Sequence, residues 1–140
     1  MTRRLVPPAF LILALAFSLA GSPPGPNGDR ECETDDRGVL RAIAQAPLKT
    51  RQWHNPYETR PDAAPAGEKL FLQHCAECHG SDARGIGHAV NLRLPAVQNA
   101  TAGELVWFLR NGNLWRGMPS WSGLPKERRW QIVTYLKSLR

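Results

Sequence analysis

Apolar residues recur at helical spacing in three stretches of the second half of the chain. The first begins at Pro65, a residue suited to the first position of a helix, and ends at His74. The second, over residues 101–111, opens with a Thr-Ala-Gly-Glu capping box, and the third covers residues 125–140. No stretch alternates polar and apolar residues as a half-buried strand does. The pattern therefore predicts an all-α fold with three or more short helices.

The N-terminus has the pattern of an export sequence. Arg3 and Arg4 precede an apolar run over residues 9–19, and the small residues Ser18 and Ala20 have the spacing of a cleavage site. About twelve apolar residues fall short of the roughly 20 that a membrane-spanning helix needs. We therefore predict a signal peptide over residues 1–20 and a periplasmic protein, which would contact the membrane only through its partners or through an uncleaved signal.

Residues 21–65 contain few side chains to bury. Residues 21–52 are rich in Pro and Gly and then acidic, which predicts a flexible linker with one short helix over residues 39–46 that Pro47 ends. Residues 53–65 hold Trp53 and Tyr57 among several prolines. We expect them to form an extended lead-in packed on a domain that covers residues 66–140.

The charge of the chain is mildly positive. Its 18 Lys and Arg residues against 12 Asp and Glu residues give a formal net charge of +6, which does not indicate a nucleic-acid-binding protein. From Ala66 onward the count is ten basic against five acidic side chains, so the positive charge is concentrated in the predicted domain. This asymmetry would favour the encounter with a partner protein that has an acidic surface, although charge that only keeps the protein soluble explains the asymmetry equally well. We expect a monomer whose partners are proteins.

A C-x-x-C-H run formed by Cys75, Cys78 and His79 is the strongest motif in the sequence. It is typical of the covalent attachment of a c-type haem, because two thiols three positions apart lie on one side of a helical turn and the histidine then lies under the iron. A structural zinc site needs a second pair of ligands, and a thioredoxin-like dithiol needs a βαβ setting; neither follows from the sequence around the motif. Cys32 is left over as an odd thiol, either idle or paired with another chain, and we expect it to be idle.

A haem held by His79 would leave one face of the iron open. Met118 lies in a Gly-Met-Pro loop between two predicted helices rather than on an apolar face, so we expect its sulfur to be the second axial ligand. His88, His54 and His74 compete for this role, and His88 is the strongest of them because it follows the motif in a glycine-rich loop. Three short helices bury too little to be stable alone, and a covalent haem would make up the shortfall.

Residues 66–140 resemble a class I, monohaem cytochrome c of the bacterial periplasmic type. The resemblance is carried by the C-x-x-C-H run together with Gly67, Phe71, Gly117-Met118-Pro119, Trp130 and Tyr135-Leu136. It implies a small cytochrome c fold wrapped around one covalently bound haem c, with an N-terminal extension ahead of it. It also implies that Gly67 and Phe71 meet Tyr135 where the first and last helices cross.

The sequence offers alternatives for two features of the haem surroundings. Many members of that family carry a proline whose carbonyl accepts the hydrogen bond of the proximal imidazole, and His88 stands where such a proline often lies. Val90 or a neighbouring carbonyl is the expected substitute. Four residues near Met118 are candidates for walling the haem from water or for bonding a propionate: Trp107, Trp115, Arg116 and Trp121.

Together these features predict an electron carrier rather than an enzyme. It would move single electrons between exported or membrane-bound redox partners through a haem c ligated by His79 and Met118. The alternatives are a haem subunit docked permanently to an exported oxidoreductase, a five-coordinate haem sensor or enzyme in which Met118 is not bound, and a dithiol oxidoreductase without haem.

Overall fold

The computed structural model describes residues 36–140, and within them the chain is all-α, as predicted. An isolated antiparallel bridge between Asn113 and Met118 is the one β pairing among these residues. The predicted signal peptide, residues 21–35 and Cys32 lie outside the described residues. The elements in chain order are α1 (Asp36–Ile43), the 3-10 helix η1 (Leu48–Gln52), α2 (Ala63–His74), α3 (Ala76–His79), α4 (Pro95–Asn99), α5 (Ala102–Asn111), the 3-10 helix η2 (Leu114–Arg116) and α6 (Lys126–Ser138).

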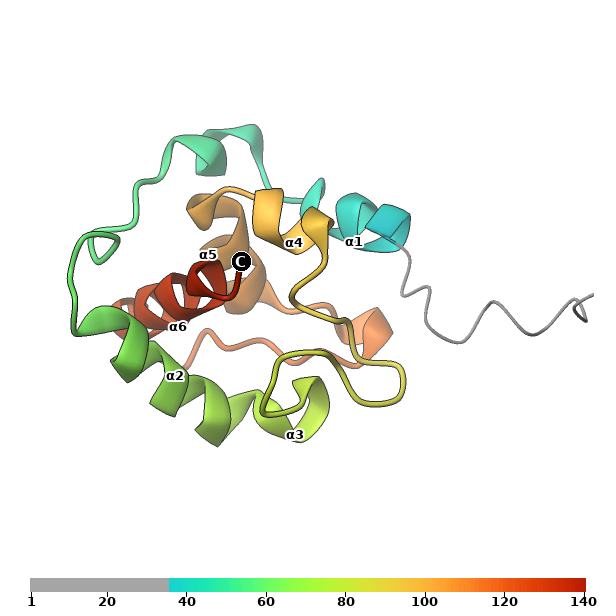
Figure 1. The fold of residues 1–140 in the computed structure, drawn as a ribbon. Helices are drawn as coiled ribbons and strands as arrows, with labels where there is room; N and C mark the ends of the chain where they lie inside the picture. The colour runs from blue at the N-terminus through green and yellow to red at the C-terminus, as the bar shows by residue number, and fades with distance from the viewer. Residues whose placement is uncertain (1–35) are drawn as a thin grey trace, which may run out of the picture.

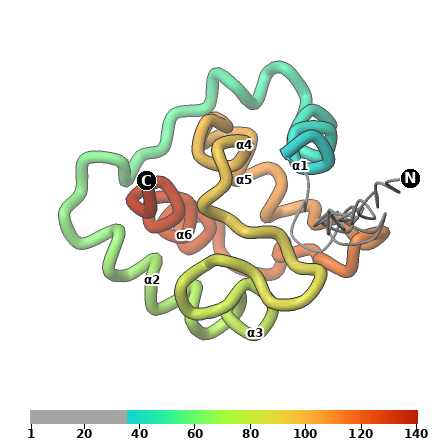
Figure 2. The backbone as a smooth tube through the Cα atoms, turned by 45° about the vertical axis from the view of Figure 1, so that its right-hand side comes forward, coloured from blue at the N-terminus to red at the C-terminus, as the bar shows by residue number. Residues whose placement is uncertain are grey.

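The helices surround one hydrophobic core. In both backbone views α2 and α3 lie along the lower side of the molecule and α1 and α4 along the upper side, with α5 and α6 between them (Figure 1, Figure 2). The α2, α5 and α6 helices correspond to the three predicted helical stretches, and α2 begins at Ala63, two residues before Pro65. A proline in the first turn costs no helical hydrogen bond, because the first N–H groups of a helix have no partner within it.

Gly67 of α2 lies directly against α6. A Cβ atom at this position would lie 2.0 Å from the carbonyl oxygen of Gln131, so only a glycine lets the two backbones approach this closely. One turn later the ring of Phe71, which is fully buried, packs against the ring of Tyr135 with a centroid distance of 5.3 Å. The contact that the family resemblance implied between the first and last helices is therefore confirmed.

The chain over residues 36–52 differs from the flexible linker expected there. The expected short helix is present, but α1 covers residues 36–43 rather than 39–46; it buries Val39 and Ile43 one turn apart against the core. The Thr50 side chain of η1 is also fully buried, and a Cβ atom on Gly103 of α5 would lie 1.8 Å from the Thr50 carbonyl oxygen. These segments are too short to be stable alone, and packing on α4 and α5 supplies their stability.

The expected lead-in connects η1 to α2 and is anchored to α6. Asn55 is buried, and its side-chain amide donates to the hydroxyl of Thr134 at 2.8 Å. The Asn55 amide oxygen accepts a hydrogen bond from the Tyr57 backbone N–H at 3.0 Å, which forms a local turn. No helix within residues 36–140 has the length and apolar character to cross a bilayer.

Candidate haem site

The C-x-x-C-H motif lies at the junction of α2 and α3. Cys75 leaves the helical conformation, with φ at −121°, while its N–H still donates to the Phe71 carbonyl at 2.8 Å. The break places Cys75 half-buried and Cys78 exposed on the short α3, which lies along the lower edge of the molecule (Figure 1). Both thiols are unpaired. The predicted attachment residues are thus adjacent but not joined to each other.

Burial, with a smaller contribution from the neighbouring Cys78, raises the pKa of the Cys75 thiol to about 11. The thiol is therefore protonated at neutral pH. Redox-active C-x-x-C pairs depend on the opposite effect, a thiolate stabilised by a lowered pKa. The environment of Cys75 therefore disfavours a dithiol oxidoreductase.

His79 closes α3 and is oriented by a backbone carbonyl. Its Nδ1 lies 2.9 Å from the carbonyl oxygen of Val90, one of the acceptors expected from the sequence. A carbonyl only accepts, so Nδ1 must carry the proton and Nε2 of the neutral ring bears the free lone pair. Burial lowers the pKa of His79 below its ordinary value of 6.5, and the bond to Val90 opposes this only in part. The imidazole is thus held neutral and in one tautomer, the state of a metal ligand.

The loop after the motif brings Val90 to His79 through close backbone contacts. Gly85 has a φ of +87°, and a Cβ atom there would lie 2.2 Å from the Ala89 carbonyl oxygen. Its N–H donates to the His79 carbonyl at 2.8 Å, and Ile86 donates to Cys78 at 2.9 Å. The loop therefore folds back tightly over α3, and only glycine at position 85 allows this.

Met118 lies two residues after the end of η2. It is half-buried, packs against the core, and pairs with Asn113 through two backbone hydrogen bonds of 2.9 and 3.0 Å. Gly117 before it adopts the left-handed conformation with φ at +78°. A Cβ atom on Gly112 would lie 2.7 Å from the Met118 carbonyl oxygen, so this glycine too is required by the tight approach. The position of Met118 is fixed by backbone contacts on both sides.

Arg129 of α6 fixes the chain that follows Met118. Its guanidinium donates from Nη1 to the carbonyl oxygens of Trp121 at 3.2 Å and Ser122 at 3.0 Å, and also to that of Leu124. Arg129 is 9% exposed, although it is charged. Sequence reasoning did not single it out. Arg129 precedes the buried Ile132 and Val133 by three and four residues, so all three lie on the inner face of α6. This spacing is the sequence signal that could have identified it.

Of the four residues expected near the haem, Trp121 contacts the residue that precedes the motif. Its indole packs against the ring of His74 with a centroid distance of 5.4 Å. The backbone N–H of Trp121 donates to the Leu109 carbonyl at 3.0 Å. Trp107 is half-buried on α5. Trp115 is fully exposed and Arg116 is exposed, so neither walls the site in this structure. A 3-10 helix turns their side chains away from the core, which the sequence pattern did not reveal.

The competing histidines lie in three different places. His74 packs on Trp121, His88 is exposed in the loop after the motif, and His54 is exposed on the lead-in beside α5 and α6. Among residues 36–140, no three His, Cys, Asp or Glu side chains form a cluster that could hold a metal ion by themselves.

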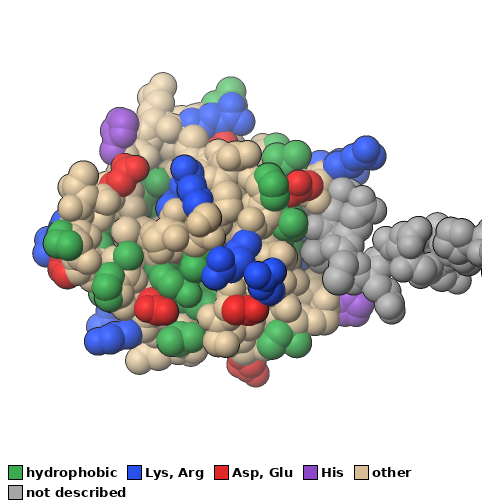
Figure 3. Space-filling model, in the orientation of Figure 1, with side chains coloured by type: hydrophobic (Ala, Val, Ile, Leu, Met, Phe, Trp, Pro, Cys, Tyr) green, Lys and Arg blue, Asp and Glu red, His purple; other side chains and the backbone are tan. Residues whose placement is uncertain are grey.

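A partly covered apolar surface surrounds the motif. Half-buried side chains from the motif segment, from the loop after it and from the loop that carries Met118 pack against the core and keep part of their surface exposed. They include Cys75, Ala76, Val90, Leu92, Met118 and Trp121. The space-filling view shows hydrophobic side chains gathered over the lower half of this face, in the region of α2 and α3 (Figure 3). A flat apolar group with charged edges could cover this surface, remove its apolar area from water and keep its own charges exposed. The residues present therefore fit a haem.

Comparison with known proteins identifies the family. Residues 62–136 match the family model described as cytochrome c oxidase, cbb3-type, subunit III. The chain belongs to this family of c-type cytochromes. Like other members, the cytochrome carries covalently bound haem c and transfers electrons.

Two relatives support the assignment. The cytochrome is 28% identical over 122 residues to cytochrome c550 of Pseudomonas aeruginosa, and the match covers 81% of each chain. It is also similar to the crystal structure of cytochrome CL from the marine methylotrophic bacterium Methylophaga aminisulfidivorans, with a TM-score of 0.52 and 28% identity. That match covers 59% of this chain and 57% of the other, so the cytochrome spans little more than half the length of cytochrome CL.

Proposed function

We propose that the protein is a monohaem electron carrier in which Cys75 and Cys78 bond the porphyrin and His79 and Met118 ligate the iron. The carrying observation is the hydrogen bond from His79 Nδ1 to the Val90 carbonyl, which leaves the lone pair of Nε2 free. When bound, the haem iron supplies a one-electron couple. No substrate would be transformed at the site, because both axial positions are filled by protein side chains.

The role of His79 follows from its neighbours. The Val90 carbonyl fixes the ring orientation and raises the electron density on the imidazole, which would stabilise the oxidised form of a bound haem iron relative to the reduced form. The Gly85 contact with Ala89 keeps that carbonyl in place. A ligand that does not reorient needs little rearrangement when an electron arrives, as a carrier requires.

The role of Met118 rests on the rigidity of its loop. The bridge to Asn113 fixes its backbone, and Arg129 holds the next turn through three carbonyls. A thioether presented from such a loop would ligate the iron without a large rearrangement, and it would raise the reduction potential of a bound haem. His54, exposed on the lead-in, and His88, exposed beyond the motif, lack this support.

The setting proposed for the carrier is the periplasm. The predicted signal peptide over residues 1–20 supports export, and attachment of haem c in bacteria takes place outside the cytoplasm. Its partners would be exported or membrane-bound redox proteins, met by a monomer whose haem domain carries excess positive charge.

Mass and absorption spectra of the exported protein test this proposal. We expect the mass of the mature chain plus one haem, and a weak far-red band in the oxidised form that marks sulfur on iron. Met118→Ala should abolish that band and allow the reduced protein to bind carbon monoxide rapidly. His88→Ala is the matched control and should change neither property.

Two outcomes would contradict the proposal at different points. A colourless product with the mass of the polypeptide alone would remove haem attachment at Cys75 and Cys78. A coloured product whose spectra do not change in Met118→Ala would keep the haem and remove the carrier role assigned to Met118.

A further inference from the structure

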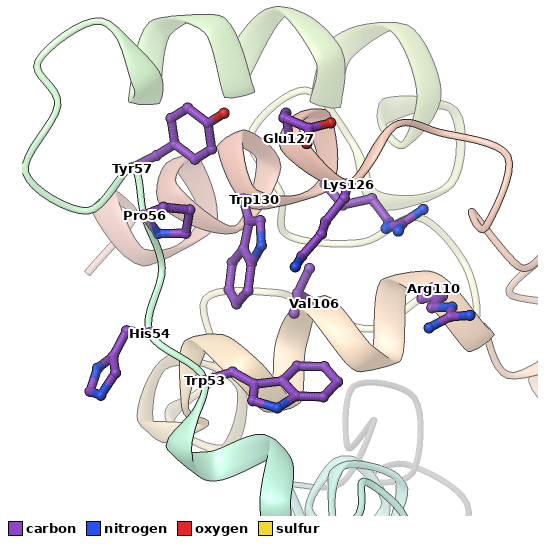
Figure 4. Close-up of a pocket in the computed structure, with 10 residues that line it drawn as sticks. Trp53, His54, Pro56, Tyr57, Val106, Arg110, Lys126, Glu127 and Trp130 are labelled. Carbon is purple, nitrogen blue, oxygen red and sulfur yellow. The ribbon is translucent and has the colours of Figure 1, made fainter.

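A groove separate from the haem site lies between the lead-in, α5 and α6. It has a volume of about 510 Å³, and none of Cys75, Cys78, His79 or Met118 lines it. Figure 4 shows it open between the lead-in on one side and the two helices on the others. A volume in this range is typical of small-molecule sites.

The walls of the groove are aromatic and apolar. Trp130 of α6 is 3% exposed, Trp53 is 39% exposed, and Val106 of α5 is buried. Figure 4 shows the Trp130 indole extending from α6 toward the lead-in, with Trp53 opposite it and Lys126 pointing into the space beside Val106. The partly exposed Trp53 indole gives a planar apolar group a surface to pack against, and Trp130, which is almost fully covered, borders the floor of the same hollow.

The walls are held in place before any ligand arrives. The backbone N–H of Trp53 donates to the Thr50 carbonyl at 3.0 Å, and the Cβ of Trp53 lies 2.8 Å from where a Cβ atom on Gly103 would be. Two residues later Asn55 bonds Thr134 of α6. A fixed wall lowers the entropy that binding must overcome.

The charges at the groove are mostly positive, with three Lys and Arg side chains against one carboxylate among the lining residues. Arg110 and Lys126 make no side-chain hydrogen bond or ion pair within residues 36–140, and Arg129 is the third cation among the lining residues. Burial and the nearby Arg110 lower the pKa of Arg129, and its Nε is buried without a partner. Glu127 is the single acidic lining residue, and Figure 4 places it at the far end of the groove from Trp53. Cations that repel one another are stabilised by a bound anion.

We propose that this groove binds a small organic anion with a planar apolar body, such as an aromatic carboxylate. The ring packs on the Trp53 indole above a floor bordered by Trp130, and Arg110 and Lys126 bind the carboxylate. Charge and shape are both required: the groove has too little polar surface for a small hydrophilic anion and too many cations for a neutral aromatic.

The test uses the full-length haem-loaded protein, labelled with nitrogen-15, and follows the indole N–H signals of its tryptophans. 2-Naphthoate should shift the signals of Trp53 and Trp130 saturably. 2-Naphthamide, which has the same ring system without the charge, should bind about tenfold more weakly, and acetate should not bind. The double variant Arg110→Gln/Lys126→Gln should weaken naphthoate binding by about tenfold or more.

The control keeps the same change in net charge. Arg41→Gln/Lys69→Gln alters two exposed cations that do not line the groove and should leave naphthoate binding unchanged within about twofold. Equal binding of naphthoate and naphthamide, equal losses in the two double variants, or no saturable shift would overturn the proposal. Binding that appears only after residues 21–35 are deleted would also overturn it, because that result would mean that this acidic stretch of the same chain is the occupant of the groove.

Discussion

The imidazole of His74 packs on the indole of Trp121 with their centroids 5.4 Å apart. This contact joins the last residue of α2, next to Cys75, to the loop that carries Met118. It is the direct side-chain link between the two halves of the proposed haem site. We therefore expect a change at this contact to affect both the stability of the protein and the binding of Met118 to the iron.

Replacing Trp121 with alanine should weaken this link. We expect Trp121→Ala to lower the free energy of unfolding by about 2 kcal/mol, less than for a fully buried tryptophan because the indole is half-buried. The far-red band of the oxidised protein should also weaken. Trp115→Ala removes the same side chain from a fully exposed position and should change stability by no more than about 0.5 kcal/mol. Similar losses in the two variants would argue against the link.

Arg129 should be essential to the Met118 loop in a way that its neighbour is not. Arg129→Gln removes the donor to three carbonyls and should cost about 3 kcal/mol in a denaturant titration, because hydrogen bonds from a buried charge are strong. Arg128 is exposed, so Arg128→Gln should stay within about 0.5 kcal/mol of the parent protein. An Arg129→Gln protein as stable as Arg128→Gln would show that the three bonds contribute nothing.

Gly85 and Gly87 provide a test of the His79–Val90 hydrogen bond. Both have positive φ, so alanine at either position carries a strain of about 1 kcal/mol. Only at Gly85 would the new Cβ collide with the Ala89 carbonyl and displace Val90, whereas nothing lies within 4 Å at Gly87. Gly85→Ala should therefore raise the reduction potential, since the imidazole loses electron density, while Gly87→Ala should not. Voltammetry of the two variants would decide, and equal potentials would count against the role of Val90.

Gly67 should tolerate no side chain. In Gly67→Ala the methyl group would lie 2.0 Å from the Gln131 carbonyl oxygen, so α2 and α6 must separate, and we expect a loss of about 3 kcal/mol. Gly123 has ordinary φ and open space around it, which makes Gly123→Ala the matched control with a change near zero. Thermal and denaturant unfolding of both variants would measure the difference. A stable Gly67→Ala protein would mean that the helices pack less closely than described.

Glu104 should make stability depend on acid pH. Burial raises the pKa of its carboxyl group, but the hydrogen bonds from Thr101 and Arg51 outweigh burial and hold the pKa below its usual value of 4.5. The ionised carboxylate therefore contributes stability above pH 4.5, and this contribution is lost as pH falls through the lower, folded pKa. Glu104→Gln should lose about 1 kcal/mol at neutral pH and be less sensitive to acid. The exposed Glu68→Gln should retain the acid sensitivity of the parent protein.

The features that could be predicted from the sequence are those that depend on neighbouring residues. The capping box from Thr101 to Glu104 and the α2 and α6 stretches could be predicted from the sequence, because caps and helical spacing act over a few residues. The C-x-x-C-H motif belongs to the same group. Its chemistry depends on the spacing within one helical turn, and the family match agrees with it. The close approach at Gly67 is a contact with α6, and only the family resemblance implied it.

Only the tertiary structure decided which distant segments meet. The choice of Val90 among the carbonyls near His79, the three bonds of Arg129 to the loop after Met118, and the full exposure of Trp115 depend on how loops cross the core. The same holds for α1 and η1, whose few apolar residues suggested a linker until α4 and α5 gave them a surface to pack on. A short segment has no stability of its own, so its structure is set by its neighbours in space rather than by its own sequence.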